Sequence, residues 1–185
     1  MNVVEICIDS DNKTHLVDNI TKVCQAGAQR IELCSAMSED GLTPCFESIN
    51  LARQVFKRSG LMVMIRPRAG GFCYNTQEID LMVEQIKAVA ELGADGVVFG
   101  VLADNGMSFN LEAMQQLIMI SRTLDLEVGI HRAFDAVRDK KATLSQLISL
   151  GVDRVLTSGT SWGSSSNAIA GMENLLSFAK LAGRN

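Results

Sequence analysis

A five-residue turn occurs three times along this chain and constrains its fold more than any other feature. Each copy opens with glycine, places an apolar residue second and leads into a hydrophobic run: Gly27-Ala28-Gln29-Arg30-Ile31, Gly93-Ala94-Asp95-Gly96-Val97 and Gly151-Val152-Asp153-Arg154-Val155. Glycine adopts the left-handed conformation that commonly ends a helix, and the residues after it can begin a strand. The repeat therefore predicts one helix-to-strand unit that is used several times.

Short runs rich in valine and isoleucine alternate with longer segments of helical periodicity, as in parallel strands joined by crossover helices. The predicted strands are Val3–Ile8, Arg30–Leu33, Met62–Ile65, Gly96–Phe99, Glu127–Ile130 and Arg154–Leu156. The predicted helices are Asp11–Ala26, Cys45–Lys57, Thr76–Leu92, Leu111–Leu124, Lys140–Leu150 and Asn167–Leu181. Repetition of one βα unit favours an α/β, TIM-like (β/α) barrel, although an open doubly wound sheet has similar periodicity. A chain of 185 residues suits one domain.

Composition narrows the classes of partner and compartment. A net charge of -4 gives no basic surface for nucleic acid or an anionic membrane, so an ion or a small molecule is the expected partner. No apolar run approaches the length of a membrane-spanning helix, and the N-terminus enters a strand without a basic leader, so we expect a cytoplasmic protein. The five cysteines form no disulfide framework and no C-x-x-C pattern, which predicts reduced thiols.

Chemically active side chains cluster at the predicted C-terminal ends of the strands, where barrel enzymes carry their active sites. The strand register places these residues on the inner face or at the rim: Glu5, Cys7, Asp9, Glu32, Cys34, Arg66, His131 and Ser158. Buried carboxylates need partners, and we expect the nearby arginines and the histidine to supply them. An ion-pair network that serves only folding is the alternative to a functional site.

Cys7 and Cys34 lie at matching ends of neighbouring predicted strands, so two thiolates could meet one ion, and thiolates suit Cu(I). The two residues could instead be staggered in height and pack as small apolar side chains. Cys24 and Cys45 are interpreted as packing residues, and Cys73 as a loop thiol with a weak functional signal. The nine methionines show no Met-x-x-Met clustering and are interpreted as core filling.

Two segments could carry catalysis. Arg66-Pro67-Arg68 precedes a glycine pair and could clamp a carboxylate or phosphate through its two guanidinium groups. His131 could act as an acid or base oriented by Asp135. Neither spacing alone defines a catalytic set.

Several motifs in chain order resemble the copper homeostasis protein CutC family over essentially the whole chain: Glu5-Ile6-Cys7-Ile8-Asp9-Ser10, Arg30-Ile31-Glu32-Leu33-Cys34-Ser35, Leu42-Thr43-Pro44, Met64-Ile65-Arg66-Pro67-Arg68, Gly93 to Gly100, His131-Arg132-Ala133-Phe134-Asp135 and Leu156-Thr157-Ser158-Gly159. The resemblance implies a cytoplasmic TIM-like barrel that self-associates as a homodimer or larger homo-oligomer. It also implies copper handling through Cu(I) bound by Cys7 and Cys34.

The alternative is a barrel enzyme that acts on a small anionic substrate held by Arg66 and Arg68. Its catalytic candidates are Glu5, Glu32, Arg66, His131 and Asp135.

The chain departs from the family pattern in its loops and its length. Gly71 stands where the family has aspartate, and Asp40 where it has glycine. The chain also stops where similar proteins continue, and six strands do not normally close a barrel. We therefore expect one CutC-like domain over residues 1–185, with about six βα units, that ends before strands seven and eight. Alternatively, a partner chain covers the open edge of the sheet.

Overall fold

The computed structural model describes residues 3–164 and 167–183 of the chain. The chain groups into two compact units, and each is described by itself below. The first contains residues 1–70, 76–98 and 120–127, and the second contains residues 71–75, 99–119 and 128–185.

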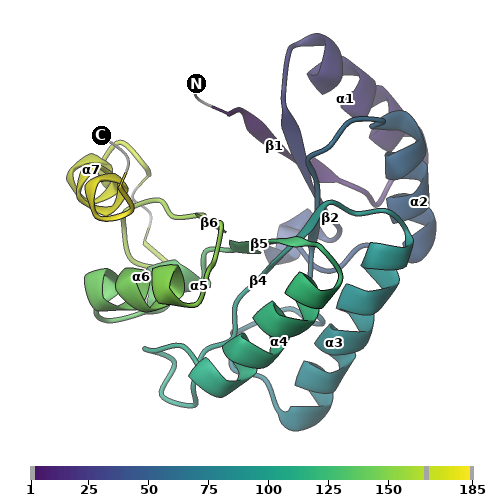
Figure 1. The fold of residues 1–185 in the computed structure, drawn as a ribbon. Helices are drawn as coiled ribbons and strands as arrows, with labels where there is room; N and C mark the ends of the chain where they lie inside the picture. Colours follow the sequence, from purple (N-terminus) through teal and green to yellow (C-terminus); the bar gives the residue numbers. More distant parts are fainter. Residues whose placement is uncertain (1–2, 165–166, 184–185) are drawn as a thin grey trace. The chain divides into compact units, whose positions relative to one another are not determined.

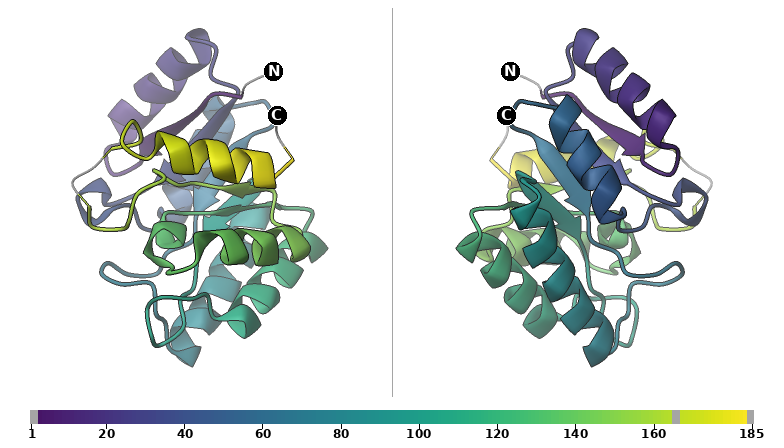
Figure 2. Two further views of the ribbon diagram at one scale, coloured as in Figure 1. Left: turned by 90° about the vertical axis from the view of Figure 1, so that its left-hand side faces the viewer. Right: turned by 90° about the vertical axis from the view of Figure 1, so that its right-hand side faces the viewer.

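The first unit is built from parallel strands with helices between them. Its elements in chain order are β1 (Glu5–Asp9), α1 (Lys13–Gln25), β2 (Arg30–Cys34), the 3-10 helix η1 (Met37–Glu39), α2 (Phe46–Val55), β3 (Leu61–Met64), α3 (Thr76–Glu91) and β4 (Gly96–Phe99), whose last residue falls in the second unit. Strands β1 to β4 pair in sequence order, each parallel to the next. Helices α1, α2 and α3 lie along the same side of these strands (Figures 1 and 2).

The second unit continues the same alternation. Its elements are most of α4 (Leu111–Thr123), β5 (Glu127–Ile130) without its first residue, α5 (Ala133–Ala136), α6 (Lys140–Ser149), β6 (Arg154–Val155) and α7 (Met172–Leu181). Strands β5 and β6 are parallel. The predicted α/β class, with parallel strands and intervening helices, is therefore confirmed.

The repeated turn forms the structure that its glycines predict. Gly27, Gly93 and Gly151 have φ values of +89°, +81° and +76°, and so are left-handed. In each turn the glycine N–H donates to the carbonyl three residues back, and the next N–H donates to the carbonyl five residues back, as from Ala28 to Val23. This is the Schellman arrangement, which satisfies the last carbonyls of the helix.

The third residue of each repeat ties its strand to the preceding one. The side chain of Gln29 accepts the Val4 N–H at 2.7 Å, just before β1. Asp95 accepts the Leu61 N–H at 2.8 Å at the start of β3, and Asp153 accepts the Val128 N–H at 2.7 Å in β5. The polar third position thus satisfies backbone donors at the N-terminal end of the sheet, where the ladder leaves them without partners.

Three differences from the sequence prediction are local. The last helix begins at Met172 rather than Asn167, because the Asn167 side chain accepts the N–H groups of Ile169 and Ala170 and forms a turn there. The short helices η1 and α5 were not predicted, since each is about one turn long and has no periodicity to detect. The other boundaries agree with the prediction to within two residues.

Candidate functional site

Cys7 and Cys34 meet in the first unit. In the parallel register, Cys7 lies opposite Glu32, and Cys34 lies opposite Asp9. Cys7 and Cys34 are therefore diagonal neighbours on one face of the β1–β2 pair, since residues two apart on a strand share a face. Their Sγ atoms are 3.5 Å apart.

The pKa values of the two thiols are shifted in opposite directions. Cys7 is exposed, whereas Cys34 is only 1% exposed. The hydrogen bond with Cys34 lowers the pKa of the Cys7 thiol, although burial and nearby carboxylates oppose this effect. The same bond, burial and Glu32 raise the pKa of Cys34. These shifts favour the thiolate at Cys7 and the protonated thiol at Cys34.

A buried carboxyl group lies beside the thiols. Glu32 is 5% exposed, and its Oε1 lies 3.9 Å from Cys34 Sγ, which donates to it. Burial and the neighbouring Glu5 raise the pKa of Glu32 to about 7. Burial also raises the pKa of Glu5, while Arg30 lowers it. The strand pair therefore presents a weakly acidic, proton-holding environment next to the sulfur atoms.

Met37 joins this cluster, and sequence reasoning missed it. Its Sδ lies 3.8 Å from Cys7 Sγ, and the residue is 42% exposed. The interpretation of all nine methionines as core filling is wrong for Met37. The available signal was its position three residues after Cys34, on a loop that begins at the end of β2. We call Cys7, Cys34 and Met37 the sulfur cluster.

Arg66 and Arg68, the predicted anion clamp, lie in the first unit with protein partners. Arg66 is 2% exposed and donates to the backbone carbonyls of Gly41 at 2.9 Å and Gly70 at 2.7 Å, and also to that of Glu39. Arg68 forms an ion pair with Glu78. Arg66 thereby links the loop after β2 to the loop after β3, and the anion-binding role stays a prediction.

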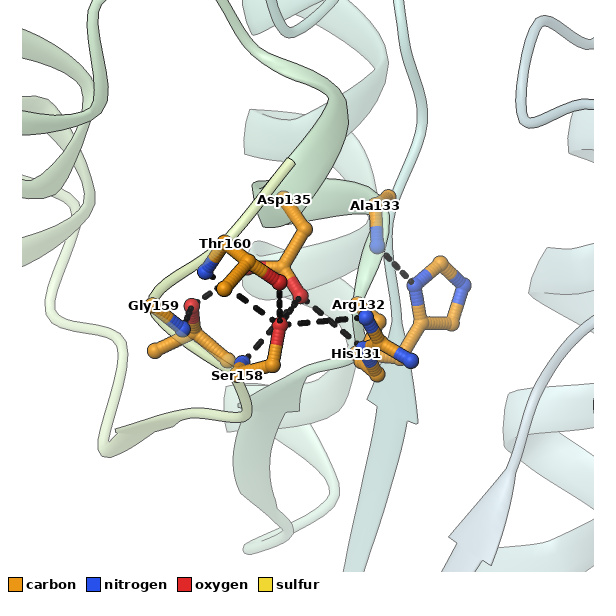
Figure 3. A network of polar contacts seen from close by, with 8 residues as sticks. His131, Arg132, Ala133, Asp135, Ser158, Gly159 and Thr160 are labelled. Carbon is orange, nitrogen blue, oxygen red and sulfur yellow. Dashed lines mark hydrogen bonds and ion pairs between the residues drawn. The ribbon is translucent and has the colours of Figure 1, made fainter. Parts of the chain in front are cut away.

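Asp135 is the centre of a polar network in the second unit (Figure 3). Its buried carboxylate accepts from Arg132 Nε at 2.9 Å, from Ser158 Oγ at 2.9 Å, from the Ser158 N–H at 3.2 Å and from the Thr157 hydroxyl. The Arg132 guanidinium also donates to Ser158 Oγ at 3.1 Å and stacks over the Trp162 ring at 5.1 Å. This network joins the segment after β5 to the segment after β6.

His131 does not receive its orientation from Asp135. Its Nδ1 accepts the Ala133 N–H at 3.1 Å (Figure 3). Its ring lies 4.8 Å from that of Phe72. An Nδ1 that accepts a hydrogen bond carries no proton, so the neutral ring has its proton on Nε2. The predicted His131–Asp135 pair is therefore replaced by two separate interactions, and the catalytic candidates stay a prediction.

Other features of the described chain do not add to these sites. A pocket of about 400 Å³ in the second unit contains none of the candidate residues and is lined by Arg138, Asp139, Lys140, Lys141, Asn174 and Phe178. Within residues 3–164 and 167–183, no three His, Cys, Asp or Glu side chains are grouped to hold a metal ion. In the same residues no helix is both long and apolar enough to cross a bilayer.

The donor set of the sulfur cluster fits a soft cation. Two thiols and a thioether are soft ligands, and these select Cu(I) over ions that prefer oxygen. The lowered pKa of the Cys7 thiol favours the thiolate, which is the form that ligates a metal. The residues present therefore fit Cu(I).

Comparison with known proteins assigns the chain to a family. The model of the CutC family matches residues 2–184. A CutC family protein of Bacteroides fragilis is 43% identical over 155 residues, which cover 84% of this chain and 58% of that protein. A human protein described as a copper homeostasis protein cutC homolog is 41% identical over 157 residues, which cover 85% of this chain and 54% of that protein. The chain thus spans less than two thirds of the length of these relatives.

Solved structures agree with the sequence comparison. The crystal structure of the putative copper homeostasis protein CutC from Streptococcus agalactiae has a TM-score of 0.86 and 32% identity, and the match covers 99% of this chain and 84% of that one. Deoxyribose phosphate aldolase from Aeropyrum pernix has a TM-score of 0.66 at 15% identity, covering 98% of this chain and 73% of that one, and shows similarity of fold alone. These likenesses confirm the predicted TIM-like fold class. The chain belongs to the CutC family.

Proposed function

We propose that this chain acts in copper homeostasis by binding Cu(I) through the thiolates of Cys7 and Cys34. The observation that carries the proposal is the 3.5 Å separation of the two Sγ atoms on adjacent parallel strands. Family membership supports the copper role, since similar proteins are described as copper homeostasis proteins. The lowered pKa of the Cys7 thiol supports metal binding, because the thiolate is the form that ligates.

The pair is suited to hold copper in the +1 state. Two soft thiolates match Cu(I), and binding displaces the proton that Cys34 retains in the free protein. Cys7 is exposed and open to an incoming ion, while Cys34 is anchored in the buried strand β2. We also propose a cytoplasmic location and a homo-oligomeric state; five free cysteines among the described residues support a reducing compartment.

Competition titration tests the proposal directly. Anaerobic Cu(I) titration against a chromophoric chelator is run on the wild-type protein and on the double variant Cys7→Ser, Cys34→Ser. We expect the variant to bind roughly a hundredfold more weakly or worse, because loss of even an outer-shell partner weakens metal sites by about 10 to 100-fold. The matched control is Cys24→Ser, Cys45→Ser, which removes two thiols outside the cluster and keeps wild-type affinity. Equal affinity in the wild type and the Cys7, Cys34 variant would end the proposal.

A further inference from the structure

The loop after β2 carries Met37 back over the two cysteines. Met37 Sδ is 3.8 Å from Cys7 Sγ, which is itself 3.5 Å from Cys34 Sγ. Gly41 lies against two of these atoms, because a Cβ built on it would be 3.4 Å from Cys34 Sγ and 3.8 Å from Met37 Sδ. Two strands and one loop thus bring three sulfur atoms to one place in the first unit.

The position of Met37 is held by its loop rather than by core packing. η1, which begins at Met37, is flanked by Ala36 and Asp40, both left-handed with φ values of +46° and +63°. This conformation is uncommon for residues other than glycine, so the surrounding contacts must maintain it. The Asp11 carboxylate accepts the Ala36 N–H at 3.0 Å, and the buried Arg66 guanidinium donates to the loop carbonyls of residues 39 and 41.

Exposure makes the Met37 side chain accessible to an incoming ion. Met37 is 42% exposed, whereas methionine in a core fills gaps between buried groups. Its sulfur lies 3.8 Å from that of the exposed Cys7. A thioether beside two thiols offers a metal a third soft donor that carries no charge and needs no deprotonation.

We propose that Met37 is the third sulfur ligand of the Cu(I) site. This inference rests on the proposed function and deepens it, since it assigns the copper ion a donor set of two cysteines and one methionine. The thioether is a donor that favours Cu(I) over Mg²⁺ and Ca²⁺, which prefer oxygen, so Met37 also contributes to metal selectivity. Asp11 and Arg66 act as positioning residues through the loop that carries it.

The experiment compares Met37→Leu with the wild-type protein in Cu(I) competition titration and in copper X-ray absorption of the loaded protein. Leucine keeps the apolar volume and removes only the sulfur donor, and circular dichroism checks that the variant is folded. We expect Cu(I) affinity to fall about tenfold or more, and the sulfur count around copper to drop from three to two. Met119→Leu, at a methionine that is 65% exposed on α4, is the matched control and keeps both values.

The outcomes separate this inference from the proposed function. Two sulfur scatterers in the wild-type protein, or equal Cu(I) affinity in wild type and Met37→Leu, overturn the role of Met37 while the two cysteines remain necessary. If the Cys7→Ser, Cys34→Ser variant binds Cu(I) as tightly as the wild type, the proposed function itself fails. A loss of one sulfur scatterer and of affinity in Met37→Leu alone supports the three-sulfur site.

Discussion

Replacing Glu32 with glutamine is expected to stabilise the metal-free protein at neutral and alkaline pH. Glu32 is 5% exposed, and burial and then Glu5 raise its pKa from the ordinary 4.5 to about 7. Between these two values the folded protein keeps a proton that the unfolded chain releases. The free energy of unfolding therefore falls as pH rises through this window.

The size of the effect follows from the same two values. Their difference is 7 - 4.5, or about 2.5, and at about 1.4 kcal/mol for each unit the destabilisation at pH 8 is roughly 3 kcal/mol. At pH 5 it is below about 1 kcal/mol, because the carboxyl group is mostly protonated in the folded state. Glutamine removes the ionisation and keeps an oxygen that can accept from Cys34.

Urea unfolding at pH 5, 6, 7 and 8 with a copper chelator present measures this dependence. The wild type is expected to lose stability relative to Glu32→Gln as pH rises, and the gap is expected to grow to roughly 3 kcal/mol by pH 8. Glu112→Gln, at an exposed carboxyl on α4, is the control and changes nothing. If Glu32→Gln and the wild type lose stability in parallel, the assignment of the raised pKa to Glu32 is refuted.

Three other predictions concern single residues. Cys7 is expected to react with iodoacetamide at pH 7 much faster than Cys34, because it is exposed and its pKa is lowered; mass spectrometry of the labelled peptides reads this, and equal rates would contradict the assignment of the thiolate. Asp135→Ala is expected to cost about 3 kcal/mol in urea unfolding, since it leaves buried donors without their acceptor, and a loss under about 1 kcal/mol would mean that the network is not structural. Gly27→Ala is expected to cost about 1 kcal/mol of stability, because the φ of Gly27 is +89° while nothing lies within 4 Å of an added Cβ. Gly96→Ala is expected to cost much more, because a Cβ there would lie 2.3 Å from a methionine carbon of β3. Equal thermal denaturation midpoints for the two variants would refute this contrast.

The fold could be predicted because its signals are local. The glycine of each repeat forms the left-handed turn, and the third residue accepts a hydrogen bond from the backbone at the preceding strand. Gly27 and Gln29 therefore specify a connection within three positions. The neighbouring placement of Cys7 and Cys34 followed from the order of the first two strands. These features need no knowledge of distant loops.

The rest of the site could not be predicted because it depends on loop conformation and on backbone partners. Met37 reaches Cys7 through a loop with left-handed residues at Ala36 and Asp40, which are not glycine and give no turn signal. Arg66 donates to backbone carbonyls, which every residue has, so its partners leave no trace in the sequence. Side-chain charges alone predict that Arg66 pairs with a glutamate.

Asp135 and Glu32 are both buried carboxyl groups, but they differ in energetic effect, and the contrast supports the proposed site. Asp135 is saturated by donors from Arg132, Thr157 and Ser158, so its burial stabilises the segments after β5 and β6. Glu32 accepts a long hydrogen bond from the Cys34 thiol at 3.9 Å, and burial raises its pKa, so ionisation of this group destabilises the folded state. Proteins retain such local instability mainly where function requires the groups concerned. The destabilised carboxyl group lies beside the sulfur cluster, which favours the thiols and Met37, rather than the Asp135 network, as the part of the chain shaped by its chemistry.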